Sequence, residues 1–527
     1  MGRCTAPKRG HRSERARRDC PVCGSQPPQQ QTPSFPRIPH SARVRGLANS
    51  SPASPSSNPP AKQIQLGTHT PTSGCFTVDL AISRTQWAAG AGFFHSCTIN
   101  ANDRRFTFVY DCGTARKFSI LQSEIDLFLK SINSSWQDSK YKKRNFTFFG
   151  TPFKDEWNPS SPTTIPTIDT VFISHFDIDH IKGLGYLIQN ATVKELVIPY
   201  TTPEERFLYL AASQQTRPSA INRTNDTPID TFTINFTANP KDAVNELCRE
   251  METDRRETRV IAVSSDSQNG RANYVTQIIV NANSPSNNQH FKSQDVSIWT
   301  IAAHTLSDNA QSYGNKLINE LINRGIISTI DDLTDPLTLG RIFSAKSSVS
   351  EITKAYRAIV GRNLNKTSLI LYSGPSQPLN TQTSDHIFWT EKSTGNATSS
   401  MFSSPILTYN FPHQAGWLGC GDAPLSSATN LSKFDSLFGD HKLFTSTFAP
   451  PHHGSLRDWN IQLLDSFGYP NEISPVCVIS ADGLHQHPDP YVISDIYSSG
   501  STPFIVTTDT RSRLTETMIA SVSCNVP

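Results

Sequence analysis

From residue 76 onward the chain alternates short apolar runs with stretches of helical spacing. FTVDLAIS, which begins at Phe76, alternates apolar and polar residues, and this predicts a half-buried strand. DTVFIS, residues 169–174, is a short apolar run that predicts a buried strand. Helical spacing follows over 120–132, and the Thr-Pro pair at 202–203 predicts a helix start. Further strands are predicted in FFHSCTIN, RRFTFVYDCG, KELVIPY, TSLILYSG, GWLGCGD, LFTSTFAPP, PVCVIS and PFIVTTD.

The middle of the chain interrupts this alternation. Residues 215–300 are polar and rich in Asn and Thr, whereas 308–361 have helical spacing. Strands on both sides of a helical and polar stretch predict an α/β sandwich that carries an insertion. We place the two halves of the sandwich at 76–204 and 363–527, and the insertion at 205–362.

The first 75 residues have a different composition from the rest. They hold 11 of the 48 Lys and Arg residues, two of the 45 acidic residues and 12 of the 36 prolines. Such a segment buries too little apolar surface to offset its ordering entropy, so we predict a disordered, low-complexity basic tail. The net charge of +3 therefore divides into +9 in the tail and −6 in the remaining chain, which has 37 basic and 43 acidic residues.

Composition also excludes several classes of protein. No run approaches the roughly 18 apolar residues that a membrane-spanning helix needs, and the N-terminus lacks the apolar segment of a secretory signal. Ten cysteines in 527 residues are too sparse for a disulfide scaffold. We therefore expect buried thiols in a soluble, cytoplasmic protein.

Four potential metal ligands lie within six residues after the apolar strand at 169–174. The segment reads His175-Phe176-Asp177-Ile178-Asp179-His180. Alternate side chains of a loop at a strand end can converge on one point, and His180, at the start of the next helix, can turn toward it. Imidazole and carboxylate together suit zinc, manganese or iron. A solvated turn is the alternative, but a buried strand delivers this loop, which favours a metal site.

This segment resembles the HxHxDH ligand signature of the metallo-β-lactamase fold, with Asp177 in place of the second His. That replacement is similar to the hydrolase domain of ComEC-type DNA-uptake proteins. Other family motifs have counterparts in the same order, across about 76–510. They are AGAG at 89–92, VYDCG at 109–113, NKTSLIL at 365–371, LGCGDA at 418–423, APPHHGS at 449–455, SADG at 480–483 and His487-Pro488. The resemblance implies an αββα metallo-β-lactamase-like sandwich.

The resemblance also implies a site for two divalent ions, Zn²⁺ or Mn²⁺. His175 and Asp177 would bind the first ion, Asp179 and His180 the second, and Asp422 would bridge them. His452 or His453 would add a ligand while the other forms a hydrogen bond at the rim. His487 is a candidate last ligand or substrate contact, and Asp111 would fix the ligand loop. Asp177, a harder ligand than His, moves the preference from zinc toward manganese.

One ligand of many family members has no clear counterpart. They supply a further His between the first motif and the Gly-Asp motif, an interval that here contains His290, His304, His386 and His413. His304 follows an apolar run and is the best of these candidates, although a core or surface position is favoured.

The predicted function is that of a metal-dependent hydrolase that uses a dinuclear metal-bound hydroxide on a phosphodiester, as a nuclease or phosphodiesterase. Asp177 or Asp179 would orient the attacking water, and His453 would protonate the leaving oxygen. Single-stranded nucleic acid is a candidate substrate, although the one compact basic run, 140–144, is more often a solvated loop. The alternatives are a lactone, lactam or thioester hydrolase on the same fold, and a non-catalytic metal-binding regulatory module.

Overall fold

A computed structural model describes most of the chain after residue 75. The predicted tail, 1–75, and the basic run at 140–144 lie outside the described residues. The described residues are 76–102, 104–139, 165–213, 230–250, 257–264, 273–281, 295–306, 311–359, 367–376, 381–392, 402–409, 414–465, 467 and 474–524.

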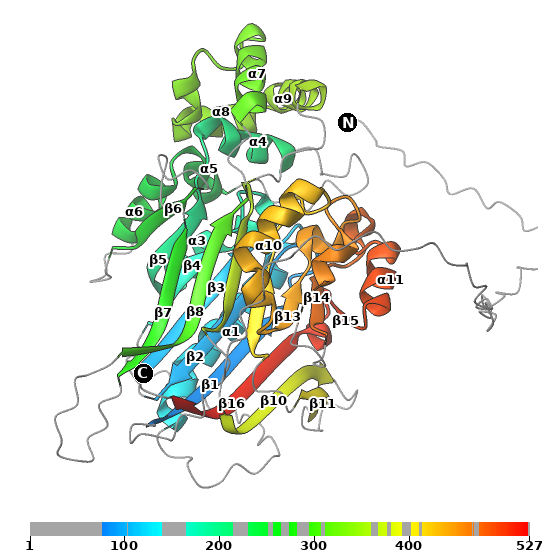
Figure 1. The fold of residues 1–527 in the computed structure, drawn as a ribbon. Helices are drawn as coiled ribbons and strands as arrows, with labels where there is room; N and C mark the ends of the chain where they lie inside the picture. Colours follow the sequence, from blue (N-terminus) through cyan, green and yellow to red (C-terminus); the bar gives the residue numbers. More distant parts are fainter. Residues whose placement is uncertain are drawn as a thin grey trace, which may run out of the picture. The chain divides into compact units, whose positions relative to one another are not determined.

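Within these residues the strands form two sheets, which face each other (Figure 1). The first sheet has the spatial order β11 (Phe402–Tyr409), β10 (Thr381–Lys392), β16 (Leu514–Cys524), β1 (Phe76–Gln86), β2 (Phe94–Ala101), β3 (Arg104–Cys112), β4 (Thr167–Phe172), β5 (Thr192–Pro199) and β6 (Arg259–Val263). The second has the order β15 (Thr502–Val506), β14 (Val476–Ser480), β13 (Thr445–Ala449), β12 (Gly416–Gly419), β9 (Leu369–Pro375), β8 (Asp295–Thr305) and β7 (Tyr274–Asn281).

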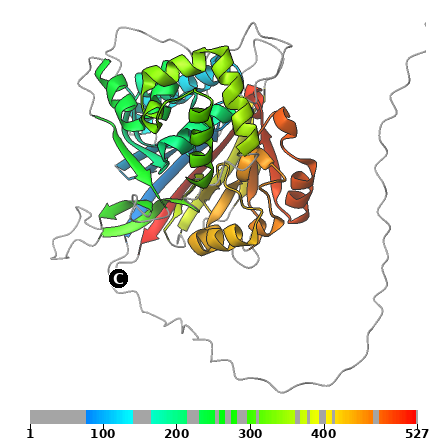
Figure 2. The same cartoon turned by 90° about the horizontal axis from the view of Figure 1, so that it is seen from above.

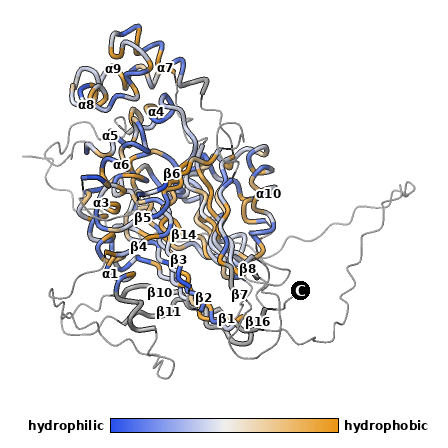
Figure 3. The backbone as a smooth tube through the Cα atoms, turned by 90° about the vertical axis from the view of Figure 1, so that its left-hand side faces the viewer, coloured by the Kyte–Doolittle hydropathy of each residue, from blue (hydrophilic) through white to orange (hydrophobic). Residues whose placement is uncertain are grey.

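The period-two pattern of β3 explains how one strand serves two cores. Phe108 and Tyr110 point into the core between the sheets, whereas Val109 joins the cluster on the outer face. Cys112 also joins the outer cluster, because the positive φ of Asp111 interrupts the alternation at the end of the strand. In the inner core, the ring of Tyr110 meets Trp417 of the second sheet at 5.3 Å between centroids. Figure 3 shows apolar residues along the strands of both layers. Burial of these aromatic side chains stabilises the contact between the sheets.

Helices cover the outer face of each sheet. The helices α1 (Phe118–Ser139), α3 (Leu184–Asn190) and α6 (Pro240–Glu250) bury apolar residues against the first sheet. The helices α10 (Ala428–Lys442) and α11 (Pro490–Ser498) do so on the second (Figure 2). The predicted αββα metallo-β-lactamase-like sandwich is therefore confirmed.

A group of helices with its own core lies at one end of the strands (Figure 1). We call it the helical cap, and it consists of α4 (Pro203–Ser213), α5 (Thr231–Ala238), α7 (Gln311–Asn323), α8 (Pro336–Ser344) and α9 (Lys346–Ile359). Phe207 of α4, Leu321 of α7 and Ile352 of α9 are buried in it. The cap contains the helical spacing predicted over 308–361.

The segment 205–362 is more than a helical and polar insertion. It supplies β6 to the first sheet and both β7 and β8 to the second. β6 pairs in parallel with β5, and β8 pairs with β9 in antiparallel fashion. β5 and β9 lie more than 50 residues from β6 and β8 along the chain, so local pattern does not reveal these pairings, whereas β7 pairs with its neighbour β8.

The described cysteines and helices can be compared with the predictions about buried thiols and membrane spans. Cys97, Cys112, Cys420 and Cys477 are buried free thiols, as expected. None of the helices in the described part of the chain is both long enough and apolar enough to cross a membrane.

Candidate metal centre

The predicted ligand loop leaves β4 at the edge where β3 also ends. Asp111, at the end of β3, is fully buried and has a positive φ of 57°. Its Oδ1 accepts a hydrogen bond from the Ser174 amide at 2.6 Å, and its Oδ2 accepts one from the Ser174 hydroxyl at 2.7 Å. Asp111 thus fixes the start of the loop, which then turns into the short helix α2 (Ile178–Ile181).

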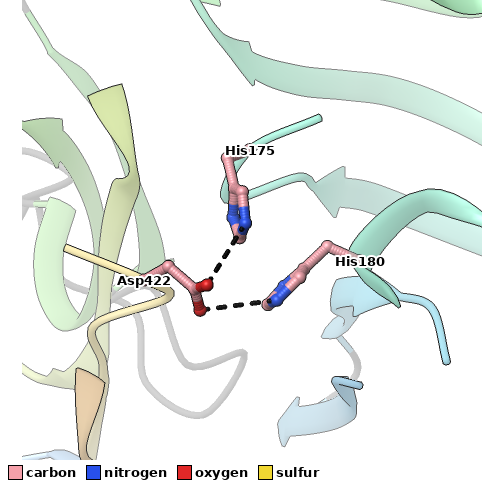
Figure 4. Close-up of side chains that lie close together, drawn as sticks. All are labelled: His175, His180 and Asp422. Atoms are coloured by element: carbon pink, nitrogen blue, oxygen red, sulfur yellow. Dashed lines mark ion pairs between the residues drawn. The ribbon is translucent and has the colours of Figure 1, made fainter. Parts of the chain in front are cut away.

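Asp422 meets this loop from the second sheet, in the turn after β12. Its Oδ2 lies 3.5 Å from Nε2 of His175, and its Oδ1 lies 3.4 Å from Nε2 of His180. Figure 4 shows both histidine rings directed toward the carboxylate. Ligand atoms of these three residues all lie within 4.8 Å of one another, and a second such group combines Asp179, His180 and His453.

The other predicted ligands extend these two groups. Oδ2 of Asp177 lies 3.4 Å from Nε2 of His175, and Oδ2 of Asp179 lies 3.5 Å from Nε2 of His453. Nε2 of His452 lies 3.5 Å from Oδ2 of Asp422. The two oxygens of Asp422 therefore face different histidines, an arrangement that suits a carboxylate shared by two cations.

His452 and His453 reach the centre through an unusual backbone. They follow β13 in the one-turn segment Pro451–Gly454, where their φ angles are 49° and 54°. Positive φ is costly for residues other than glycine, about 1–3 kcal/mol each, and such strain concentrates at functional sites. It lets two successive imidazoles point toward the same cluster of carboxylates.

The hydrogen bonds of the histidines leave their Nε2 atoms directed at the centre. Nδ1 of His453 donates to the carbonyl oxygen of Ser480 at 2.8 Å, so its Nε2 carries the lone pair. Nδ1 of His180 lies 2.8 Å from Oδ2 of Asp111, and Nδ1 of His452 lies 2.5 Å from Oδ2 of Asp458. A histidine whose far nitrogen is held in this way is typical of metal sites.

The donor set fits divalent cations. Nε2 of His175, His180 and His453 are buried and have no hydrogen-bond partner among the described residues. A buried polar atom left in this state costs about 1–3 kcal/mol. The spacings of 3.4–3.5 Å between nitrogens and carboxylate oxygens agree with ligands about 2.0–2.2 Å from a shared tetrahedral ion, which lie about 3.4 Å apart.

Burial and opposite charges shift the pKa values of these groups. Burial raises the pKa of Asp422, but the three histidines that face it outweigh burial and hold its pKa well below the usual value. Burial lowers the pKa of His180, but the carboxylates of Asp111 and Asp422 raise it well above 6.5. Burial also lowers the pKa of His452, but Asp422 and Asp458 raise it to about 9. Without metal, His180 and His452 therefore retain their protons at neutral pH.

We expect Asp458→Asn to lower the pKa of His452 in the metal-free protein by about one pH unit or more, because it removes an adjacent carboxylate charge. The folded-state pKa of about 9 exceeds the unfolded value of about 6.5. This histidine therefore stabilises the native state fully below pH 6.5, and the contribution disappears as the pH rises through 9. Histidine NMR titration measures the shift. An unchanged His452 titration in the variant would contradict it.

Glycine at position 113 lets two parts of the centre approach closely. A Cβ at Gly113 would overlap the carbonyl group of Asp179 and the amide nitrogen of His180. The family-like VYDCG motif thus ends in glycine because the ligand loop passes directly over it.

Gly113→Ala is expected to destabilise the protein by about 1–3 kcal/mol through overpacking and to weaken metal binding about 10–100-fold by moving the loop. Urea unfolding and metal competition with a chelating dye measure the two effects. The control is Gly439→Ala in α10, where no atom lies within 4 Å of the added Cβ; it should stabilise the helix slightly. Equal metal affinity in both variants would refute the close-approach argument.

None of the four histidines between the first motif and Asp422 is found at the centre among the described side chains. His304 packs edge-on against Phe438, with 5.3 Å between ring centroids. His290 and His413, and the side chain of His386, lie outside the described part of the structure.

Several residues that surround His175 had no predicted role in the site. Ser368 Oγ lies 3.5 Å from Nδ1 of His175 and accepts the Asp422 amide at 3.1 Å. The ring of Tyr209, in the helical cap, lies 5.7 Å from the ring of His175 between centroids. The Tyr209 hydroxyl lies 2.9 Å from the Thr367 hydroxyl. The helical cap therefore reaches the part of the centre that contains His175.

His487 lies beside the centre and belongs to neither ligand group. Its ring is 5.4 Å from the ring of His452.

Asp458, which orients His452, was not predicted from the sequence. Its only signal is its place five residues after the two histidines of APPHHGS, and no local rule connects that spacing to a hydrogen bond.

Comparison with known proteins agrees with the fold. The model of the metallo-beta-lactamase superfamily matches residues 92–236, which include Asp111 and the 175–180 loop but end before Asp422. No curated protein matches the chain. The more specific resemblance to ComEC-type domains and the roles of individual site residues stay predictions. The matched segment is thus similar to the metallo-beta-lactamase superfamily, and the similarity indicates a metal-dependent hydrolase.

Proposed function

We propose that this protein is a metal-dependent phosphodiesterase or nuclease with a two-ion centre. The observation that carries the proposal is the position of Asp422. One of its oxygens faces His180 and the other faces both His175 and His452. Two divalent ions in such a centre would lower the pKa of a bound water toward 7 and stabilise charge on the substrate oxygens.

Charge favours an anionic substrate once the ions are bound. The ligand carboxylates of Asp177, Asp179 and Asp422 carry −3, and two divalent ions carry +4. A phosphodiester carries one negative charge, which complements the small positive remainder.

A cationic side chain at the rim supports the same substrate class. Arg457 is exposed and lies two residues after the APPHHGS motif. It lies within electrostatic reach of Tyr356 in the helical cap, whose pKa is raised by burial and by the Asp177 charge and lowered by the Arg457 charge. Because Asp177 and Arg457 both act on the same tyrosine, we propose that the exposed Arg457 side chain contacts a phosphate oxygen on the Asp177 side of the centre.

The geometry favours His452 over His453 as the proton donor to the leaving oxygen. If His453 is a ligand through Nε2, it has no proton to give, because its Nδ1 hydrogen is bonded to Ser480. His452 is partly exposed, with 23% of its side chain accessible, and Asp458 lies behind its ring. The Asp458 carboxylate raises the pKa of His452, which favours a proton on its Nε2. Asp179 stays the proposed residue for orienting the attacking water.

The test compares phosphodiester, lactone and thioester reporters with Mn²⁺- or Zn²⁺-loaded protein. We expect turnover of bis(p-nitrophenyl) phosphate and of single-stranded DNA, and its loss in the double variant Asp179→Ala, His180→Ala. The matched control replaces another adjacent Asp-His pair, Asp440 and His441 on α10, with alanine and should remain active.

Three outcomes would contradict the proposal. Equal turnover by wild type and the Asp179, His180 double variant would show that the centre is not responsible. Preferential cleavage of the lactone or thioester would indicate the alternative hydrolase on this fold. Near-zero metal after gentle purification, together with no turnover of any reporter, would indicate a non-catalytic module.

A further inference from the structure

An open pocket of about 980 Å³ lies beside the metal centre. It is formed by the turn after β14, the start of α11 and the edge strand β15. Its apolar wall is made by Pro488, Pro490, Ile493 and Ile505. This volume is within the range of about 300–1,000 Å³ that is usual for small-molecule sites.

The pocket and the metal centre share a wall. His487 lines the pocket, and its ring is 5.4 Å from that of His452. The amide of Asp489 donates to the carbonyl oxygen of Gly454 at 3.0 Å, which holds the start of α11 against the Pro451–Gly454 turn. A group bound in the pocket would therefore contact His487, whose ring is next to His452 of the centre.

The far side of the pocket is held in place by an ion pair and a close backbone approach. Arg116 donates two hydrogen bonds to Asp482, at 2.7 and 2.8 Å. A Cβ at Gly90 would lie 2.5 Å from Cγ2 of Thr508 and 2.6 Å from Oδ2 of Asp482, so the loop at 88–92 packs directly on this wall. The pocket is thus preformed, which lowers the entropic cost of binding.

We propose that this pocket binds the nucleobase attached to the phosphodiester, so that the substrate is a nucleotide ester. The assignment rests on the proposed function. Proline rings and β-branched side chains offer flat apolar surface for one face of a base. Gln486 and Thr508 add an amide and a hydroxyl, which can donate to and accept from a base edge. A purely acyl group would leave these polar groups without a use.

Binding measurements test the pocket separately from catalysis. Isothermal titration of the Mn²⁺-loaded full chain compares thymidine 5′-monophosphate with methyl phosphate, which share the phosphate but differ in the nucleoside. We expect wild type to bind the nucleotide at least tenfold more tightly. Ile505→Asn should abolish this preference and leave the affinity for methyl phosphate unchanged.

The control is Ile519→Asn, because Ile519 has a similar exposure of 42%, against 39% for Ile505, but lies on β16 of the other sheet. Thr508→Val, a nearly isosteric change, provides a second variant if Ile505→Asn does not fold. It should reduce the preference for the nucleotide severalfold.

Equal wild-type affinity for the two phosphates, or equal losses for both in Ile505→Asn, would overturn the assignment. Cleavage of bis(p-nitrophenyl) phosphate without any nucleotide preference would leave the proposed function in place and remove the pocket from it. Nucleotide preference without metal-dependent cleavage would support the pocket and contradict the proposed function.

Discussion

Replacing Asp422 with Asn is expected to release bound metal and to lower metal-dependent hydrolysis by about a hundredfold or more, because even residues that only support a metal ligand contribute about 10–100-fold. Both oxygens of this side chain face histidine nitrogens, at 3.4–3.5 Å. Asn has the same shape, but an NH2 group, which cannot bind a cation, replaces one of the two oxygens. The substitution also removes the negative charge. The centre would then hold two carboxylate ligands in place of three.

Elemental analysis after dialysis measures the metal lost, and kcat/KM with a phosphodiester reporter measures the activity. Asp465→Asn is the control, because Asp465 is an exposed carboxylate away from both ligand groups. Unfolding of the metal-free proteins by urea separates loss of metal from loss of fold. Two ions per chain in Asp422→Asn, as in wild type, would refute the shared-carboxylate arrangement.

Local sequence patterns predicted the elements that carry the ligand loop. The apolar residues Val171, Phe172 and Ile173 of DTVFIS are consecutive because β4 lies between β3 and β5, with one face in each core. The loop from His175 to His180 begins where that apolar run ends. Strand-end geometry therefore brought its side chains together, as the spacing suggested. The family resemblance predicted that Asp422 and the histidines at 452 and 453 would join this site, and the structure shows that they follow β12 and β13 of the second sheet.

Long-range pairing explains what local pattern missed. β16 lies beside β1 at the far end of the chain, and β10 and β11 extend the same sheet. LTETMIASVSC in β16 mixes Thr and Ser with apolar residues, which suits a strand but gives no clue to its partner. Similarly, TFTINFTA in α5 is rich in β-branched and aromatic residues. It forms a helix because Asp230 caps it, accepting from the Thr233 amide at 2.7 Å, and because Phe236 packs into the outer core.

The parts of the site that sequence could not predict are the supporting contacts. Nδ1 of His453 is held by a main-chain carbonyl, which leaves no trace in side-chain identity. Tyr209 lies near His175 because α4 follows the end of β5, at the same edge of the sheet as the loop after β4. Such contacts depend on backbone positions that many different sequences could provide, so no motif reports them.

Glu516→Gln is expected to destabilise the protein by about 3–5 kcal/mol, because it leaves a buried cation without its counter-charge. Arg84 on β1 and Glu516 on β16 face each other across adjacent strands, and both are almost completely buried. Glu516 also accepts hydrogen bonds from Ser446 at 2.8 Å and Thr447 at 2.5 Å, both on β13 of the second sheet. The pair therefore connects the two layers of the sandwich.

Urea unfolding of the full chain measures the loss of stability in Glu516→Gln, and two further variants serve as controls. Glu351→Gln removes the same charge from an exposed pair with Arg324 and Lys354, where solvent screening leaves little stability to lose. Arg84→Met combined with Glu516→Gln removes both charges and should be more stable than Glu516→Gln alone, since no cation is then buried unpaired. A double variant less stable than the single one would mean that Arg84 stabilises the fold through its bond to Ser446 rather than through the ion pair.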